Sequence, residues 1–135
     1  MADLNLEPLF NQKKREFNTM GAGSTRFEDD FLVCTNRAIN VINRRADLET
    51  PIARINVKED DVNLDYKYED VLSDGISMFM VSAGQRPAKG FETILKDVSQ
   101  RFSDGVDSIR YDIINKAQAA DTDDESNFAN LGGLG

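Results

Sequence analysis

The longest regular pattern in the chain is a row of large apolar residues that recur at alternating steps of four and three. Its members are Phe91, Leu95, Val98, Phe102, Val106, Ile109 and Ile113. Such steps place every member on one face of an α-helix. The sequence therefore predicts a helix from about Ala88 to Lys116. Because the steps average 3.5 residues, which is typical of helices packed nearly parallel, we expect a hairpin with the preceding helix.

A second helix is predicted from Thr25 to about Ala46. Thr25 and Glu28 fit a capping box, in which each side chain bonds a free backbone amide at the start of a helix. One face is apolar and carries Phe27, Phe31, Cys34, Ala38 and Val41, widened by Ile39 and Ile42. This pattern predicts a helix with one buried face, on which Cys34 is a small buried hydrophobe.

A third helix is predicted between Asp65, which can cap its start, and Gly84, which can end it in a left-handed conformation. Pro87 blocks any continuation. Gly75 lies in its middle, where glycine costs about 1 kcal/mol relative to alanine. Two interpretations stay open for Gly75: close contact with another helix, or a functional bend.

Shorter elements are predicted on either side of the second helix. The stretch "LNLEPLFNQKKREF", residues 4–17, predicts a short, loosely packed helix with a basic cluster. After Pro51, apolar and polar residues alternate in two short runs that fit a β-hairpin near 52–64. Such a hairpin needs a helix or a neighbouring subunit to cover it.

The fold class expected from these elements is mainly α. It is a small helical bundle with a long C-terminal helix, a helical hairpin, a short β-hairpin and flexible termini. We divide the 135 residues into an N-terminal arm with a short helix (1–24), a helical domain (25–117) and a flexible acidic, glycine-rich tail (118–135). A domain of this size has a small core, which oligomerisation would help to stabilise.

Composition excludes several kinds of chemistry. The chain has no histidine and one cysteine, so histidine-based acid–base catalysis and an intramolecular disulfide are excluded. The acidic clusters fit a helix start and a solvated turn rather than a calcium loop. We therefore expect no enzyme activity, no cofactor and no metal site. No apolar run approaches the roughly 20 residues that span a bilayer, so we expect no membrane partner.

A row of amides marks the second helix. Asn36, Asn40 and Asn43 follow one another at steps of four and three beside the apolar face, and Arg44 and Arg45 come next. Asparagine is a mediocre helix former, so the row needs an explanation. One interpretation is a solvated border; the other is a subunit interface that hydrogen-bonds across a wet contact. The candidate interface residues are Asn36, Asn40, Asn43, Arg44 and Arg45.

The tail has only three large apolar side chains, Phe128, Leu131 and Leu134, after an acidic run. Such a segment cannot bury enough surface to fold alone. Spaced apolar residues on a flexible segment are typical of a peptide that orders on a partner, but loose termini also occur without any function.

The order of these elements resembles the head–tail connector (adaptor) proteins of tailed bacteriophages. The resemblance depends on "TRFEDDFLVCTNRAINVINRRADLETPI", then "YEDVLSDGISMFMVSAGQRPAKG", then the long amphipathic helix, and it covers about residues 25–115. It implies a virion protein that forms a ring, typically of twelve copies, beneath the portal protein. Such a ring extends the DNA channel and offers a platform to the next neck or tail protein.

The resemblance also implies a role for the tail, because connector subunits commonly reach the portal with a terminal segment. Phe128, Leu131 and Leu134 are then the expected portal-binding residues. The net charge of −8 disfavours specific DNA binding but suits a channel through which DNA passes. The protein is expected in the host cytoplasm during assembly and in the virion neck afterwards. The alternative is a small acidic helical regulator that binds a host target through its tail.

Overall fold

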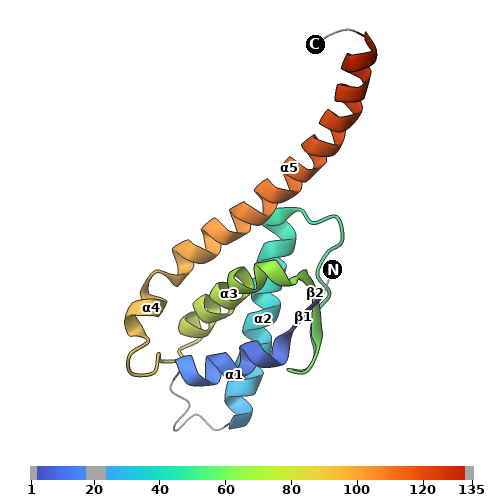
Figure 1. The fold of residues 1–135 in the computed structure, drawn as a ribbon. Coiled ribbons are helices and arrows are strands. Elements are labelled where there is room, and N and C mark those ends of the chain that lie inside the picture. Colours follow the sequence, from blue (N-terminus) through green and yellow to red (C-terminus); the bar gives the residue numbers. More distant parts are fainter. Residues whose placement is uncertain (1–2, 18–23, 133–135) are drawn as a thin grey trace.

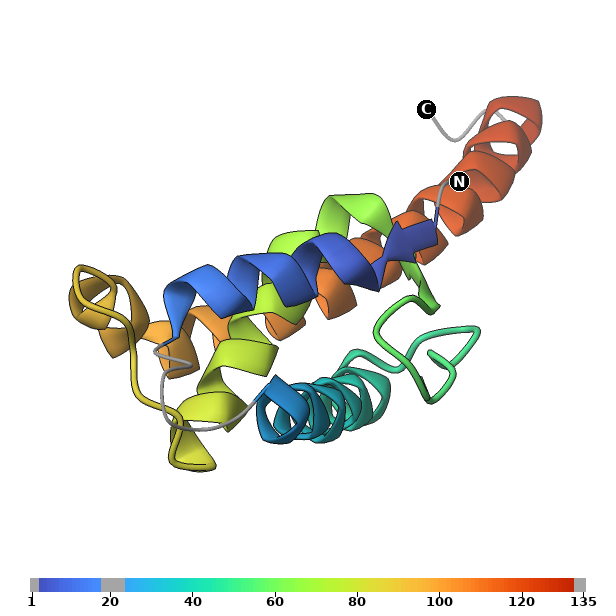
Figure 2. The same cartoon turned by 90° about the horizontal axis from the view of Figure 1, so that it is seen from below.

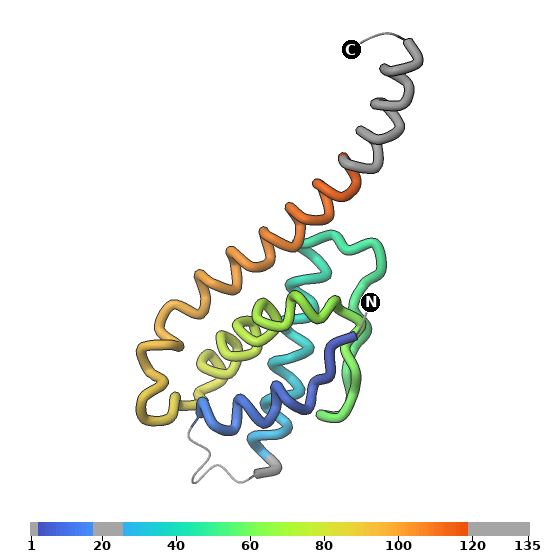
Figure 3. Tube along the Cα trace, in the orientation of Figure 1, coloured from blue at the N-terminus to red at the C-terminus, as the bar shows by residue number. Residues whose placement is uncertain are grey.

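The computed structural model describes residues 3–17 and 24–132, with side chains up to residue 118 (Figures 1 and 3). It is mainly helical, with a two-stranded antiparallel sheet, as predicted. The capping box at Thr25 and the tail side chains lie outside the described side chains. The elements are β1 (Asp3–Asn5), α1 (Leu6–Glu16), α2 (Ser24–Ala46), β2 (Asp61–Asp65), a 3-10 turn (Tyr66–Tyr68), α3 (Glu69–Ser82), α4 (Glu92–Lys96) and α5 (Val98–Gly132).

The core lies where α2, α3 and α5 pack together (Figure 1). Seen from below, α2 lies along one side of the bundle, and α1 and α5 lie along the other (Figure 2). The predicted apolar face of α2 is confirmed: all its members are buried except Val41, which is partly buried. Burying one face of an amphipathic helix is the main source of its stability in a protein.

The predicted helix from Ala88 to Lys116 is wrong at both ends. Gly90 adopts a left-handed conformation (φ +95°), α4 ends at Lys96, and α5 starts only at Val98. The row of apolar residues at steps of four and three does not require a continuous helix. Leu95 and Val98 belong to this row and are both buried, although the helix is interrupted between them. At its other end, the α5 backbone continues to Gly132.

Gly75 lies at a close contact between helices, which favours the first of its two interpretations over a functional bend. A Cβ atom added there would lie 2.5 Å from Phe102 Cε1 on α5 and 2.9 Å from Ala38 Cβ on α2. Both distances are shorter than real Cβ contacts. The missing side chain therefore lets α3 approach both neighbours at once.

Replacing Gly75 with alanine is expected to lower the free energy of unfolding by about 1–3 kcal/mol, the usual cost of overpacking a core. This loss opposes the gain of up to about 1 kcal/mol in helix propensity. Urea unfolding measures the effect, and Ser82→Ala, at an exposed position of the same helix, is the control. A Gly75→Ala protein as stable as the wild type would show that the contact is not tight.

The N-terminal helix is not loosely packed, contrary to our expectation. Leu6, Leu9 and Phe10 of α1 are buried, and the Phe10 ring centroid lies 5.0 Å from that of Phe31 on α2 in an edge-to-face arrangement. β1, which precedes α1, pairs antiparallel with β2. The arm thus contributes a helix and a strand to the core.

The predicted hairpin near 52–64 is only half right. Its second strand exists as β2, but β2 pairs with β1 from the N-terminus. Residues 51–56 form no strand. Their backbone groups are instead bonded by side chains, as described below.

Cys34 is 1% exposed, as predicted for a small buried hydrophobe. Burial, with a smaller contribution from the Asp30 charge, raises the pKa of Cys34 to about 11. Because the thiolate is the reactive form, we expect no modification of the native protein by an aromatic disulfide reagent at pH 8 and full modification in urea. Rapid reaction of the native thiol would contradict this placement.

Candidate assembly surfaces

Two of the three amides in the predicted row bond a neighbouring stretch of backbone. The Asn36 side chain accepts from Ile55 N (2.9 Å) and donates to Ile55 O (3.0 Å). The Asn43 side chain accepts from Ile52 N (2.7 Å) and donates to Ile52 O (2.9 Å). Each amide thus replaces the pair of hydrogen bonds that a partner strand would provide.

A third asparagine bonds the same segment from the other side. Asn63, on β2, accepts from Ala53 N (2.7 Å) and donates to Pro51 O (3.1 Å). Buried backbone groups need partners, and here side-chain amides supply them. This explains why residues 51–56 are extended without forming a strand, and why asparagines stand on α2. The expected location of Asn36, Asn40 and Asn43 at a subunit interface stays a prediction.

The turn after this segment is held by the carboxylate of Asp60. Asp60 Oδ2 accepts from Asn56 N (2.7 Å) and Val57 N (3.0 Å). These two donors lower the pKa of Asp60. Next to it, Lys58 Nζ lies 3.2 Å from Glu28 Oε1 and joins the turn to α2. The acidic turn is therefore a structural cap, in line with the solvated turn that we expected.

The two adjacent arginines have different surroundings. Arg45 Nη2 lies 2.9 Å from Asp107 Oδ1 and 3.3 Å from Ser103 Oγ, so Arg45 joins α2 to α5. Arg44 is exposed and forms no ion pair with another described side chain. Of the five predicted interface residues, only Arg44 and Asn40 therefore point to solvent without a described partner.

Asn40 and Arg44 belong to a longer exposed row on α2. Val33, Arg37, Asn40 and Arg44 follow one another at steps of four, three and four, and all are exposed. These steps place them on one side of the helix. We call these four residues the α2 outer face. Val33 and Arg37 were not among the predicted interface residues, although their spacing from Asn40 was visible in the sequence.

The outer part of α5 projects from the bundle (Figure 1). Ile109 is the last fully buried residue of the helix among the described side chains. Beyond it Tyr111 is 65% and Ile114 38% exposed, and Tyr68 Oη donates to Asp112 Oδ2 over 2.9 Å. We call residues 111–118 the outer α5 segment. The predicted portal-binding residues come later in the chain, outside the described side chains.

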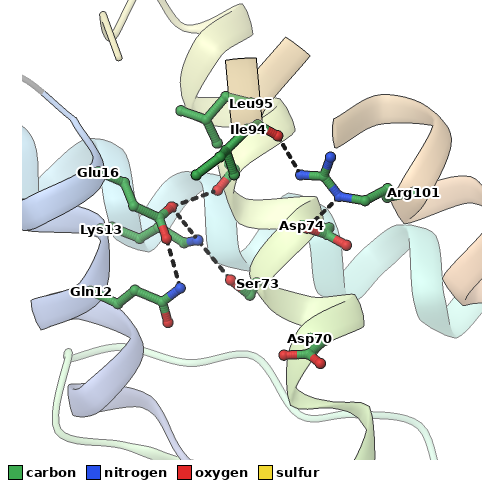
Figure 4. A pocket seen from close by; sticks show the side chains of 10 residues that line it. Gln12, Lys13, Glu16, Asp70, Ser73, Asp74, Ile94, Leu95 and Arg101 are labelled. Carbon is green, nitrogen blue, oxygen red and sulfur yellow. Dashed lines mark hydrogen bonds and ion pairs between the residues drawn. The ribbon is translucent and has the colours of Figure 1, made fainter. Parts of the chain in front are cut away.

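A polar cavity of about 340 Å³ opens between α1, α3, α4 and α5 (Figure 4). Its most buried charged group is Lys13, whose Nζ donates to Glu16 Oε1 (2.9 Å) and to Ser73 Oγ (2.7 Å). On the other side of the cavity Arg101 Nε lies 3.5 Å from Asp74 Oδ1. The lining residues are Gln12, Lys13, Glu16, Asp70, Ser73, Asp74, Ser77, Ile94, Leu95 and Arg101.

Burial dominates the electrostatics of this cavity. It lowers the pKa of Lys13, although the Glu16 charge acts in the opposite direction. It also raises the pKa of Asp74, against the effect of Arg101. Because the Lys13 ammonium is paired with Glu16 and donates to Ser73, it does not act as a base toward that serine. The arrangement fits a binding cavity better than a catalytic one.

Comparison of the chain with family models, curated proteins and solved structures finds no match. Within the described part of the chain, no helix is both long and apolar enough to cross a membrane. The same residues contain no group of three or more metal-binding side chains placed to hold an ion.

Proposed function

We propose that this chain is a structural assembly subunit that works as a head–tail connector adaptor. In this proposal its copies form a ring beneath a portal protein, extend the DNA channel and present a platform to a neck or tail protein. The observation that supports it best is the outer α5 segment, which leaves the bundle with apolar side chains exposed.

A helix that projects into solvent gains little from packing. The 35 residues of α5 would extend about 52 Å at 1.5 Å per residue; among its described side chains, Ile109 is the last fully buried one and Ile113 is partly buried. A helical segment that packs against nothing is marginal in water, because most helical stability comes from burying an apolar face. The outer α5 segment therefore suits a protein that packs against a partner.

The tail is the proposed link to the portal. Phe128, Leu131 and Leu134 follow one another at steps of three residues, so they would lie near one another if the tail forms a helix on the portal. In this proposal they insert into apolar grooves of the portal, as helical binding motifs do. The net charge of −8 is compatible with a channel wall over which DNA moves without binding.

Deleting residues 121–135 tests the proposal. We expect the truncated chain to keep its helical circular dichroism over residues 24–118 but to lose capture by immobilised portal protein. A chain in which only Phe128, Leu131 and Leu134 are changed to alanine should lose capture too, whereas an Asp123→Ala/Asp124→Ala chain should keep it. Undiminished capture by the truncated chain would refute the docking role. A chain that stays monomeric and does not bind the portal would favour the alternative function, a small regulator that binds a host target.

A further inference from the structure

The α2 outer face and the polar cavity lie on opposite sides of the bundle. Figure 4 looks into the cavity, and the ribbon of α2 passes behind α3 in that view. Figure 2 shows α2 along one side of the bundle, and α1 and α5, which help to line the cavity, along the other. A ring of identical subunits needs two unlike, complementary patches of this kind, because each copy contacts the next head to tail.

The two patches have complementary charge. On the α2 outer face, Arg37 and Arg44 are exposed and form no ion pair with another described side chain. The cavity is lined by three carboxylates against two cations, which leaves one negative charge in excess. At its rim, Asp70 is exposed and has no ion-pair partner among the described residues.

The patches also have matching apolar groups. Val33 is 51% exposed and stands one helical turn before Arg37. Ile94, which lines the cavity, is 54% exposed. Exposed apolar side chains of this size are typical of the centre of an interface when charged groups flank them. Val33 and Arg37 are one helical turn apart, so an approach that brings Arg37 to the cavity also brings Val33 to the same side of the next copy, where Ile94 lies.

We infer that Arg37 on the α2 outer face of one copy enters the polar cavity of the next copy and pairs there with Asp70 and Asp74, while Val33 packs on Ile94. This inference depends on the proposed ring and names its subunit contact. The cavity volume equals the share of roughly ten water molecules, which is ample for a guanidinium group. A guanidinium has five N–H donors, enough to bond both of these carboxylates.

A second copy fits the cavity better than a small anion does. The excess negative charge repels phosphates and carboxylates, and Lys13 is already paired with Glu16. Asp70 has no ion-pair partner among the described residues, and the cation at ion-pair distance from Asp74, Arg101, lies at 3.5 Å and is itself exposed, so both carboxylates can accept a further cation. The chain itself carries such a cation, Arg37, on the opposite face.

Charge exchange tests the contact in the full chain. Arg37→Glu and Asp70→Arg are each expected to weaken self-association by at least about tenfold in sedimentation equilibrium. The chain with both changes should recover most of the association, because the charges still match between copies. Arg86→Glu and Asp61→Arg, exposed positions elsewhere, are matched charge controls and should associate as the wild type does.

Cross-linking tests the proximity directly. Arg37→Cys and Asp70→Cys chains, mixed and treated with a short bis-maleimide, should give a covalent dimer that neither chain gives alone, since Cys34 is buried. Suppose that the wild-type chain associates, that Asp70→Arg does not weaken this association, and that no cross-linked dimer forms. This result would refute the proposed contact but not the proposed ring. A wild-type chain that stays monomeric with and without portal would overturn the ring and the contact together.

Discussion

Replacing Lys13 with methionine is expected to lower the free energy of unfolding by about 3–5 kcal/mol, the largest effect of any single change considered. Lys13 is 1% exposed and Glu16 8%, so the substitution leaves a buried carboxylate without its cation. Ser73 also loses the ammonium that donates to it. Urea unfolding at pH 7 measures the difference.

The paired change Lys13→Met/Glu16→Leu is expected to recover most of that loss. Replacing both members of a buried ion pair with apolar groups is often neutral, because the desolvation of two charges is avoided. Lys14→Met on the same helix is the control; its side chain is exposed, and the change should stay within about 0.5 kcal/mol. A double variant no more stable than Lys13→Met would show that the loss arises from packing rather than from an unpaired charge.

Replacing Asn36 and Asn43 together with alanine is expected to lower the free energy of unfolding by about 2–5 kcal/mol. Each amide makes two bonds to the backbone of a buried isoleucine, and a buried group left without its partner costs about 1–3 kcal/mol. Hydrogen exchange should show the amides of Ile52 and Ile55 losing protection first.

Asn40→Ala is the matched control for that experiment. Asn40 belongs to the same row on α2 but is exposed and makes no hydrogen bond to another described side chain or backbone group. We expect a change within about 0.5 kcal/mol. Equal losses for Asn40→Ala and Asn36→Ala would contradict this account, because alanine is the better helix former and only Asn36 bonds the backbone of Ile55.

Local patterns predicted the helices well where one face is buried. The apolar row of α2 was visible because its members repeat at helical spacing, and Gly84, with φ +95°, ends α3 as expected. The partner of β2 could not be predicted in this way. Leu4 pairs with Val62, which lies 58 positions later in the sequence, and a three-residue strand such as β1 carries too little pattern to be recognised.

The polar groups were harder to interpret, because a sequence shows the residue but not its partner. Lys13 looked like a member of a basic surface cluster. Its spacing from Leu6, Leu9 and Phe17 nevertheless puts it on the buried face of α1, with Glu16 one turn later to pair with it. The asparagines of α2 were recognised as unusual from the sequence. Two of them, Asn36 and Asn43, bond the backbone of Ile55 and Ile52 in the same chain.

The most direct test of the proposed role is negative-stain imaging of the purified chain mixed with purified portal protein. The proposal predicts a closed ring of the chain, in fixed proportion to the portal, seated on one end of it. It also predicts that the ring is lost on deletion of residues 121–135. Particles of portal alone, with the chain remaining monomeric in solution, would contradict it.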